Sequence, residues 1–231
     1  MADDIHSGHR QRMRERFRQT ELEGFQPHEV LEMLLYYGIP RKDTNQIAHA
    51  LLDTFGDIHE VLSATSEQLR AIPGMTDNAV SLIEYLRAMR CYEMQEQFKE
   101  TILDTYPKVC NYFRKLYVYE SREIVRAAFL DEYLHLKYTA VVSEGHPTAA
   151  TFSARKLIEL SIRTGCNTVI LAHNHPKGTA AISADDIAVT RILGDKLFAQ
   201  EIELADHVIV GCDRAISLRE CGAFIGLDCN L

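Results

Sequence analysis

The feature that most constrains the fold is a short apolar run, Thr168-Val-Ile-Leu-Ala172, with polar residues on both sides. Such a run is typical of a strand buried on both faces, which needs neighbouring strands and covering helices. Before it, Phe152–Thr164 has the apolar spacing of an amphipathic helix that ends at Gly165. After it, Ser183–Phe198 fits a helix with Ser183 as its N-cap. The second half of the chain is therefore predicted to be an α/β or α+β domain.

Four other segments have the character of strands in the same domain. They are Ile124–Leu130, Leu134–Val142, Glu203–Val210 and Ala215–Leu218. A turn at residues 131–133 is predicted to join the first two, and the last two are predicted to close the sheet.

Residues 1 to about 104 have a helical pattern instead. Val30, Met33 and Leu34 fall on one face of a helix that Gly38 and Pro40 end. Further helices are predicted at residues 44–55, 57–62, from 65 onward and 79–89, followed by a charged helix or linker at 90–105. The predicted domains are an all-helical domain at residues 1–104 and the α/β (α+β) domain at residues 105–231.

Composition excludes several classes of protein. The chain has 231 residues, of which 46% are hydrophobic and 25% charged, so a fibrous or disordered protein is excluded. The net charge of -8 argues against a protein whose whole surface binds nucleic acid. No apolar stretch reaches the roughly 18 residues of a membrane helix. The start, Met1-Ala-Asp-Asp, lacks the features of a secretion signal, so we expect a cytoplasmic protein with no membrane contact and with reduced cysteines.

The residues that carry chemistry follow the buried run. His173 and His175 lie two residues apart where the strand ends, so both side chains can reach one point beyond it. Asp186 lies one turn into the next helix, from which its carboxylate can return to that point. Two imidazoles and one carboxylate, with a fourth position left for water, are the ligands of a catalytic zinc site.

Each of these residues also has an ordinary explanation. A His-x-His pair is more often two surface or core histidines than a metal site. Ser183 alone is a helix cap, and Asp186 alone is an acid favoured by the helix dipole. The combination is more specific: His, any residue, His, seven residues, Ser, two residues, Asp.

This combination resembles the HxH(x)7SxxD signature of the JAMM metalloprotease domain, also called JAB or MPN. Within that group the sequence most resembles the bacterial RadC family, in which the His173-Asn-His175-Pro176 form is common. The resemblance covers nearly the whole chain. It implies an N-terminal helix-hairpin-helix region followed by a curved β-sheet flanked by helices.

The resemblance also implies roles for particular residues. His173, His175 and Asp186 would bind one Zn²⁺ per chain, and Ser183 would stabilise an oxyanion. A glutamate upstream would act as the general base, and Glu123 fits best because Arg122-Glu-Ile-Val-Arg resembles the start of the family's first strand. Three other glutamates compete for that role, namely Glu120, Glu132 and Glu144. His207, in an Asp-His-hydrophobic pattern that the family shares, is interpreted as a packing residue or a support for a ligand.

The implied reaction is zinc-dependent hydrolysis of a peptide or isopeptide amide in a protein or peptide substrate. Zinc lowers the pKa of a bound water and polarises a carbonyl oxygen. Glu123 would move the proton. The alternative is a JAMM domain that has lost activity and only binds metal or a partner.

Two features of the N-terminal half suggest nucleic-acid binding. Ile72-Pro-Gly74-Met resembles the turn of a helix-hairpin-helix motif, whose backbone N–H groups contact a DNA phosphate. Here Thr76 replaces the second glycine and Asp77 would repel a phosphate, so a hairpin that packs without DNA is an equal alternative.

The second feature is a run of arginines that includes Arg10, Arg12 and Arg14. Such a run can bind phosphates, or it can be a solvated helix face paired with nearby acids. The runner-up function is therefore a DNA-associated accessory protein, linked to DNA repair through the RadC resemblance, in which the second domain does not hydrolyse a substrate.

Overall fold

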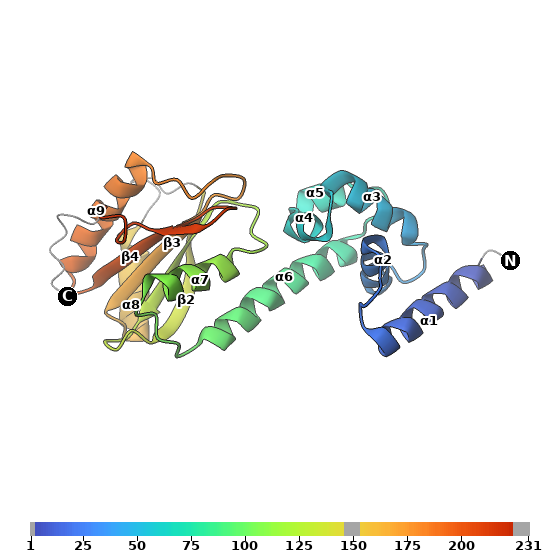
Figure 1. The fold of residues 1–231 in the computed structure, drawn as a ribbon, viewed down its shortest axis with the longest axis horizontal. Helices are drawn as coiled ribbons and strands as arrows, with labels where there is room; N and C mark the ends of the chain where they lie inside the picture. The colour runs from blue at the N-terminus through green and yellow to red at the C-terminus, as the bar shows by residue number, and fades with distance from the viewer. Residues whose placement is uncertain (1–2, 146–152, 224–231) are drawn as a thin grey trace. The chain divides into compact units, whose positions relative to one another are not determined.

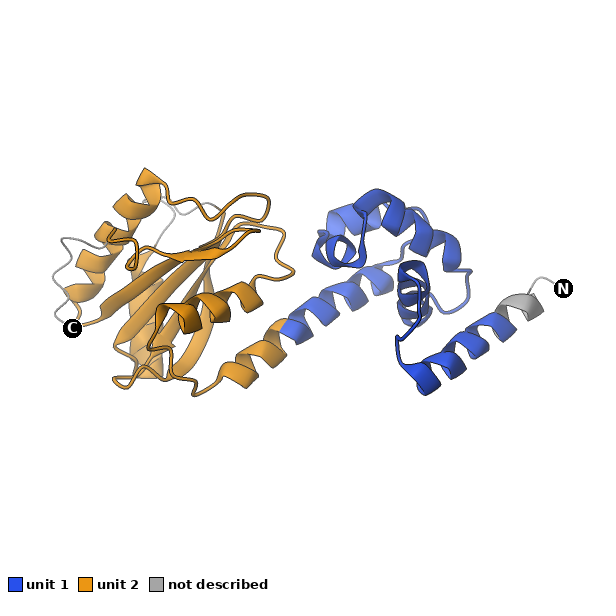
Figure 2. Cartoon of the chain, viewed as in Figure 1, with its two compact units in different colours: residues 1–90 blue, residues 91–231 orange. Residues whose placement is uncertain are grey.

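The structure, a computed structural model, describes residues 3–145 and 153–223. It divides into two compact units, residues 1–90 and 91–231 (Figure 2). The change of unit comes earlier than the position after residue 104 expected from the sequence. It falls inside a single helix, Asp77–Phe98, which extends into the residues after 89 for which a charged helix or linker was predicted. Phe152, the first residue of a predicted helix, lies outside the described residues.

Among its described residues, unit 1 contains helices joined by turns and loops, and no strand (Figure 1). They are α1 (Asp3–Thr20), α2 (Pro27–Gly38), α3 (Asn45–Phe55), α4 (Ile58–Ser63), α5 (Ser66–Arg70) and the first part of α6 (Asp77–Phe98). Leu31, Leu51 and Ile83 are among the fully buried side chains of its core. A helical core of this kind forms because each helix has one apolar face to bury.

Local signals account for the ends of these helices. Thr65 caps α5 in a capping box with Gln68, and Gly56 ends α3 with a φ of 96°. Gly38 has a different reason to be glycine. A Cβ atom there would lie 2.5 Å from the Cα atom of Ala79, so α2 and α6 approach too closely for any side chain.

Arg10 has a structural role within unit 1. Its guanidinium donates hydrogen bonds to the carbonyl oxygens of Ile39 at 2.9 Å, Pro40 at 2.6 Å and Lys42. These carbonyls follow the C-terminus of α2, where a cation is favoured by the helix dipole. The guanidinium also lies over the ring of Tyr36, 4.5 Å from its centroid. Arg10 therefore fastens α1 to the end of α2.

Within its described residues, unit 2 contains an open, mixed sheet of five strands in the order β2-β1-β3-β4-β5. The strands are β1 (Ile124–Leu130), β2 (Leu136–Glu144), β3 (Thr168–Asn174), β4 (Glu203–Val210) and β5 (Ala215–Ser217). β3 pairs antiparallel with β1 and parallel with β4. Every residue of β1 and β3 is buried, as expected for strands in the middle of a covered sheet.

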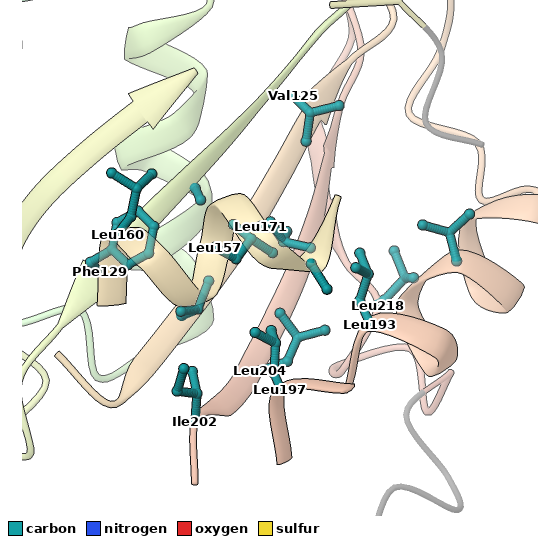
Figure 3. Close-up of a cluster of buried hydrophobic side chains, with 14 of the residues drawn as sticks. Val125, Phe129, Leu157, Leu160, Leu171, Leu193, Leu197, Ile202, Leu204 and Leu218 are labelled. Atoms are coloured by element: carbon teal, nitrogen blue, oxygen red, sulfur yellow. The ribbon is translucent and has the colours of Figure 1, made fainter. Parts of the chain in front are cut away.

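Helices cover both faces of this sheet (Figure 1). On one face, α8 (Ala154–Thr164) and α9 (Ala184–Phe198) pack on a core that includes Phe129, Leu157 and Leu171 (Figure 3). On the other face, α7 (Tyr106–Leu116) contributes Tyr112 and Phe113 to a second core.

The predicted fold class is confirmed, since N-terminal helices precede an α+β unit in which helices flank the sheet. The predicted bounds of β1 and β4 are those observed. The helix α7 was not predicted from the sequence. Among the described helices, none combines the length and apolar character that crossing a membrane requires.

We predict that Arg10→Ala lowers the free energy of unfolding of unit 1 by about 1 kcal/mol, because three carbonyl contacts and one ring contact are lost. Chemical denaturation of the full chain, followed by circular dichroism, measures this change. Arg12→Ala is the matched control, because Arg12 is exposed on the same helix. An equal loss in both variants would contradict the structural role of Arg10.

Candidate metal centre

The candidate site lies where β3 ends. His173 and Asn174 are the last residues of β3, and His175 follows directly. The backbone N–H of His175 donates to Val210 O at 2.8 Å, which continues the pairing with β4 by one residue. Side chains alternate along a strand, so His173 lies on one side and Asn174 on the other. His173 and His175 can therefore meet on the same side.

Three side chains meet at this point. Glu123, His173 and His175 each offer a ligand atom, and these atoms lie within 4.8 Å of one another. The Nε2 atoms of His173 and His175 are 3.1 Å apart, and Glu123 Oε1 is 3.9 Å from His175 Nε2. His173 is completely buried, whereas Glu123 and His175 remain partly exposed, so water can reach the cluster. Glu123 was expected from the sequence to act as a general base, and it lies at this point.

Asp186, the expected third ligand, lies beside this group on α9. Its Oδ1 atom is 3.3 Å from His173 Nε2. The carboxylate is completely buried, and Oδ1 has no hydrogen-bond partner among the described residues. Asp186 is outside the group whose ligand atoms lie within 4.8 Å of one another, which Glu123 joins instead. A buried carboxylate oxygen without a donor is costly unless a cation compensates it.

Ser183 fixes the orientation of Asp186. The two residues form a capping box at the start of α9, in which Ser183 N donates to Asp186 Oδ2 at 2.8 Å and Asp186 N donates to Ser183 Oγ at 3.1 Å. The Ser183 hydroxyl also donates to Asp186 Oδ2 at 2.6 Å. The single proton of the Ser183 hydroxyl is therefore directed at Asp186. The role expected for Ser183 in stabilising an oxyanion stays a prediction.

His207 determines which nitrogen of His173 carries the proton. The Thr190 hydroxyl lies 2.6 Å from the Asp186 carbonyl, which can only accept, so its proton lies there. His207 Nδ1, 2.7 Å from the same hydroxyl, must then donate to it. The other nitrogen of His207 is left as an acceptor for His173 Nδ1 at 2.9 Å. Burial lowers the pKa of His207 to about 4, which favours the neutral ring that this pattern needs.

His175 is held in the same tautomer. Its Nδ1 lies 3.0 Å from the carbonyl oxygen of Thr179, so Nδ1 carries the proton. The Nε2 atoms of both histidines therefore carry no proton. These two nitrogens are 3.1 Å apart, and their lone pairs face each other. This arrangement is unfavourable by itself and favourable when a cation is bound. Together with the unsatisfied oxygen of Asp186, it shows that these residues fit a metal ion.

The loop that carries His175 is braced by a second loop, which follows β4. Cys212 N donates to Gly178 O at 3.0 Å, and Ala180 N donates to Asp213 Oδ1 at 3.1 Å. Gly211 lies so close to Ala180 N that a Cβ atom would be 2.2 Å from it.

The competing glutamates do not join this cluster. Glu144 forms an ion pair with Arg122 at 3.3 Å, and Glu120 lies 3.8 Å from the same guanidinium. Glu132 lines a hollow beside Thr168, at the other end of β3 from the histidines. None of the three belongs to the metal-ligand cluster found among the described residues.

The residues predicted to bind nucleic acid all lie in unit 1. Arg14 lies over the rings of Tyr36 and Tyr37, at 5.9 Å and 5.7 Å from their centroids. Gly74 has a φ of 90°, the conformation expected of a tight hairpin turn. Beside this turn, Asp77 pairs with Arg70 at 2.9 Å. Nucleic-acid binding stays a prediction.

One comparison with known proteins bears on this unit. A family model described as RadC-like JAB domain matches residues 103–223. The match contains all five strands and each of the residues Glu123, His173, His175, Ser183 and Asp186. Sequence reasoning missed Thr190, whose only signal was its position four residues after Asp186 on one helix face.

We predict that Thr190→Val weakens Zn²⁺ binding by roughly tenfold, the lower end of the effect of groups that support metal ligands. Without the hydroxyl, His207 is free to carry its proton on Nε2, which moves the His173 proton to the nitrogen that binds the metal. Competition with a chelating dye measures the affinity.

Thr164→Val is the matched control for this experiment. Its hydroxyl also donates to the carbonyl four residues earlier, Leu160 O at 2.8 Å, but near the end of α8. Equal Zn²⁺ affinities for both variants and the wild type would contradict the role of Thr190.

Proposed function

Because the chain belongs to the RadC family of JAB-domain proteins, we propose that unit 2 is a zinc-dependent hydrolase that cleaves a peptide or isopeptide amide. One observation carries this proposal. Glu123, His173 and His175 converge within 4.8 Å, beside a buried Asp186 oxygen that has no hydrogen bond. A structural core has no use for two imidazole lone pairs that face each other next to a carboxylate.

The donors at this site favour zinc. His173 and His175 offer Nε2 nitrogens, and Asp186 offers a carboxylate oxygen. Two histidines and one carboxylate are typical of catalytic zinc, with a further position available for water. When bound, such an ion supplies Lewis acidity, which lowers the pKa of a water molecule and polarises an amide carbonyl.

The chain's own residues supply the remaining chemistry. Glu123 takes a proton from the attacking water at a carboxylate oxygen, while the water oxygen forms a bond to the amide carbon. The bond from that carbon to the amide nitrogen then breaks, and Glu123 passes the proton to the leaving nitrogen. Its partial exposure suits this role, because the carboxylate must be reached by both water and substrate.

Ser183 supports this chemistry indirectly in the proposal. By holding Asp186 Oδ2 through two hydrogen bonds, it leaves Oδ1 directed at His173. Its contribution to an oxyanion would require the hydroxyl to turn away from Asp186.

The alternative function, a DNA-associated accessory protein, gains no support from Arg10 and Arg14. Both side chains contact groups of their own unit, through the carbonyls that follow α2 and the rings of Tyr36 and Tyr37. Arg12 and the turn at Gly74 remain the residues through which such binding would be tested.

We predict one zinc per chain by elemental analysis and none in the His173→Ala/His175→Ala variant. We also expect the zinc-loaded protein to cleave members of a set of fluorescence-quenched peptides and peptides linked through a lysine Nε atom. Bound zinc without cleavage of any probe would contradict the hydrolase and favour the accessory protein. Absence of zinc, even after its addition, would contradict the metal site itself.

The Glu123→Gln variant distinguishes whether Glu123 acts as a general base or as a metal ligand. We predict that it keeps the zinc and lowers turnover by at least about 10²-fold, the usual contribution of a general base. Loss of zinc would instead identify Glu123 as a ligand. Glu144→Gln is the matched control, since Glu144 is a nearby glutamate paired with Arg122, and it should keep both zinc and turnover.

A further inference from the structure

Asn174 lies between the two histidines in the sequence, but its side chain serves a different part of the chain. It is 2% exposed. Alternation along β3 is visible in the two cores, since Leu171 belongs to the face covered by α8 and α9 and Ala172 to the other face. His173 follows Leu171 in this alternation, and Asn174 follows Ala172. A buried amide with no role among the metal ligands needs another explanation.

The hydrogen bonds of the Asn174 side chain go to the segment that enters β1. Its Oδ1 accepts from Ile124 N at 2.9 Å. Its Nδ2 donates to Arg122 O at 3.0 Å and to Glu120 O at 3.3 Å. The bonded groups of Arg122 and Ile124 lie on either side of Glu123. One side-chain amide therefore holds the backbone immediately before and after that glutamate.

The side-chain amide of Asn174 forms hydrogen bonds just beyond the point where the backbone pairing of β1 with β3 stops. The last pair of the ladder between β1 and β3 is Val125 with His173. Beyond this pair, the Asn174 side-chain amide accepts from Ile124 N and donates to Arg122 O, as a backbone peptide group would. The side chain thereby continues the hydrogen bonding between the two segments. Glu123 is also held from its other edge, because Gly145 N donates to Glu123 O at 2.7 Å.

Few side chains could replace asparagine here. Aspartate would keep the acceptor for Ile124 N but would lose both donors and place a charge against two carbonyl oxygens. Glutamine is one methylene longer, and serine has a single proton to donate. The three contacts need one acceptor and two donors on a short side chain, which is what asparagine supplies.

We propose that Asn174 is a positioning residue, which holds Glu123 in place against His173 and His175. The strand that presents the metal ligands thereby also fixes the segment that carries the base. The proposal rests on the proposed function in one respect, namely that Glu123 moves the proton.

The expected effect is on turnover rather than on metal or substrate binding. A displacement of about 1 Å at a catalytic group can cost on the order of 10²-fold in rate. Asn174→Asp should therefore lower kcat by roughly 10- to 100-fold. We expect zinc content and KM to stay near the wild-type values, because neither His173 nor His175 loses a contact.

The experiment compares Asn174→Asp with Asn167→Asp, which makes the same chemical change at the other end of β3, on an exposed residue. In Asn174→Asp both donors to the carbonyls of Arg122 and Glu120 are lost and the new charge repels those oxygens, so this segment should separate from residue 174. Hydrogen exchange of the zinc-loaded full chain should therefore become faster at the Ile124 amide in Asn174→Asp and stay unchanged in the control. Turnover is measured on whichever quenched or isopeptide-linked probe the wild type cleaves. If Asn174→Asp fails to fold, Asn174→Ser, which keeps an oxygen for Ile124 N, takes its place.

A double variant tests whether Asn174 acts through Glu123. In the Glu123→Gln background, Asn174→Asp should cause no further loss of turnover, since the base is already absent. An equal loss in both backgrounds, loss of zinc, or unchanged exchange at Ile124 would each overturn the proposal. If the wild type cleaves none of the probes, the proposed hydrolase fails, and the exchange measurement alone decides whether Asn174 holds the backbone on either side of Glu123.

Discussion

The arrangement of the candidate site depends on the alternation of side chains along β3, which is fixed because β1 and β4 pair with its two edges. His173 lies with the core under α8 and α9, and Asn174 lies on the opposite face. A slip of one residue would exchange these faces for every side chain of the strand. The pairing that stabilises the sheet therefore also decides which residues can meet a metal and which can hold the base.

Local patterns were enough to predict much of this. The bounds of β1 and β4 follow from their apolar runs, and the start of α9 follows from the N-cap at Ser183. The return of Asp186 toward the histidines was also predictable, because a helix N-terminus fixes the first turn and the capping box fixes the carboxylate.

Other parts depend on contacts between distant residues, which one sequence does not display. His207 reaches His173 across 34 positions, and Asn174 reaches Ile124 across 50. The arginine run suggested a surface for phosphates, whereas the structure directs Arg10 to the carbonyls after α2. The missed helix α7 is different, since Val109, Tyr112 and Phe113 have helical spacing and Pro107 suits a helix start, so its signal was present.

Loops are ordinarily where a fold gains and loses residues most readily. The two loops beside the candidate site are an exception, because Gly211 has no space for a Cβ atom against Ala180, and Cys212 pairs with Gly178. An inserted residue in one loop would shift its partners in the other, together with His175. Changes of length during evolution, and any segment grafted by design, should therefore be tolerated better at the other end of the sheet than at this one.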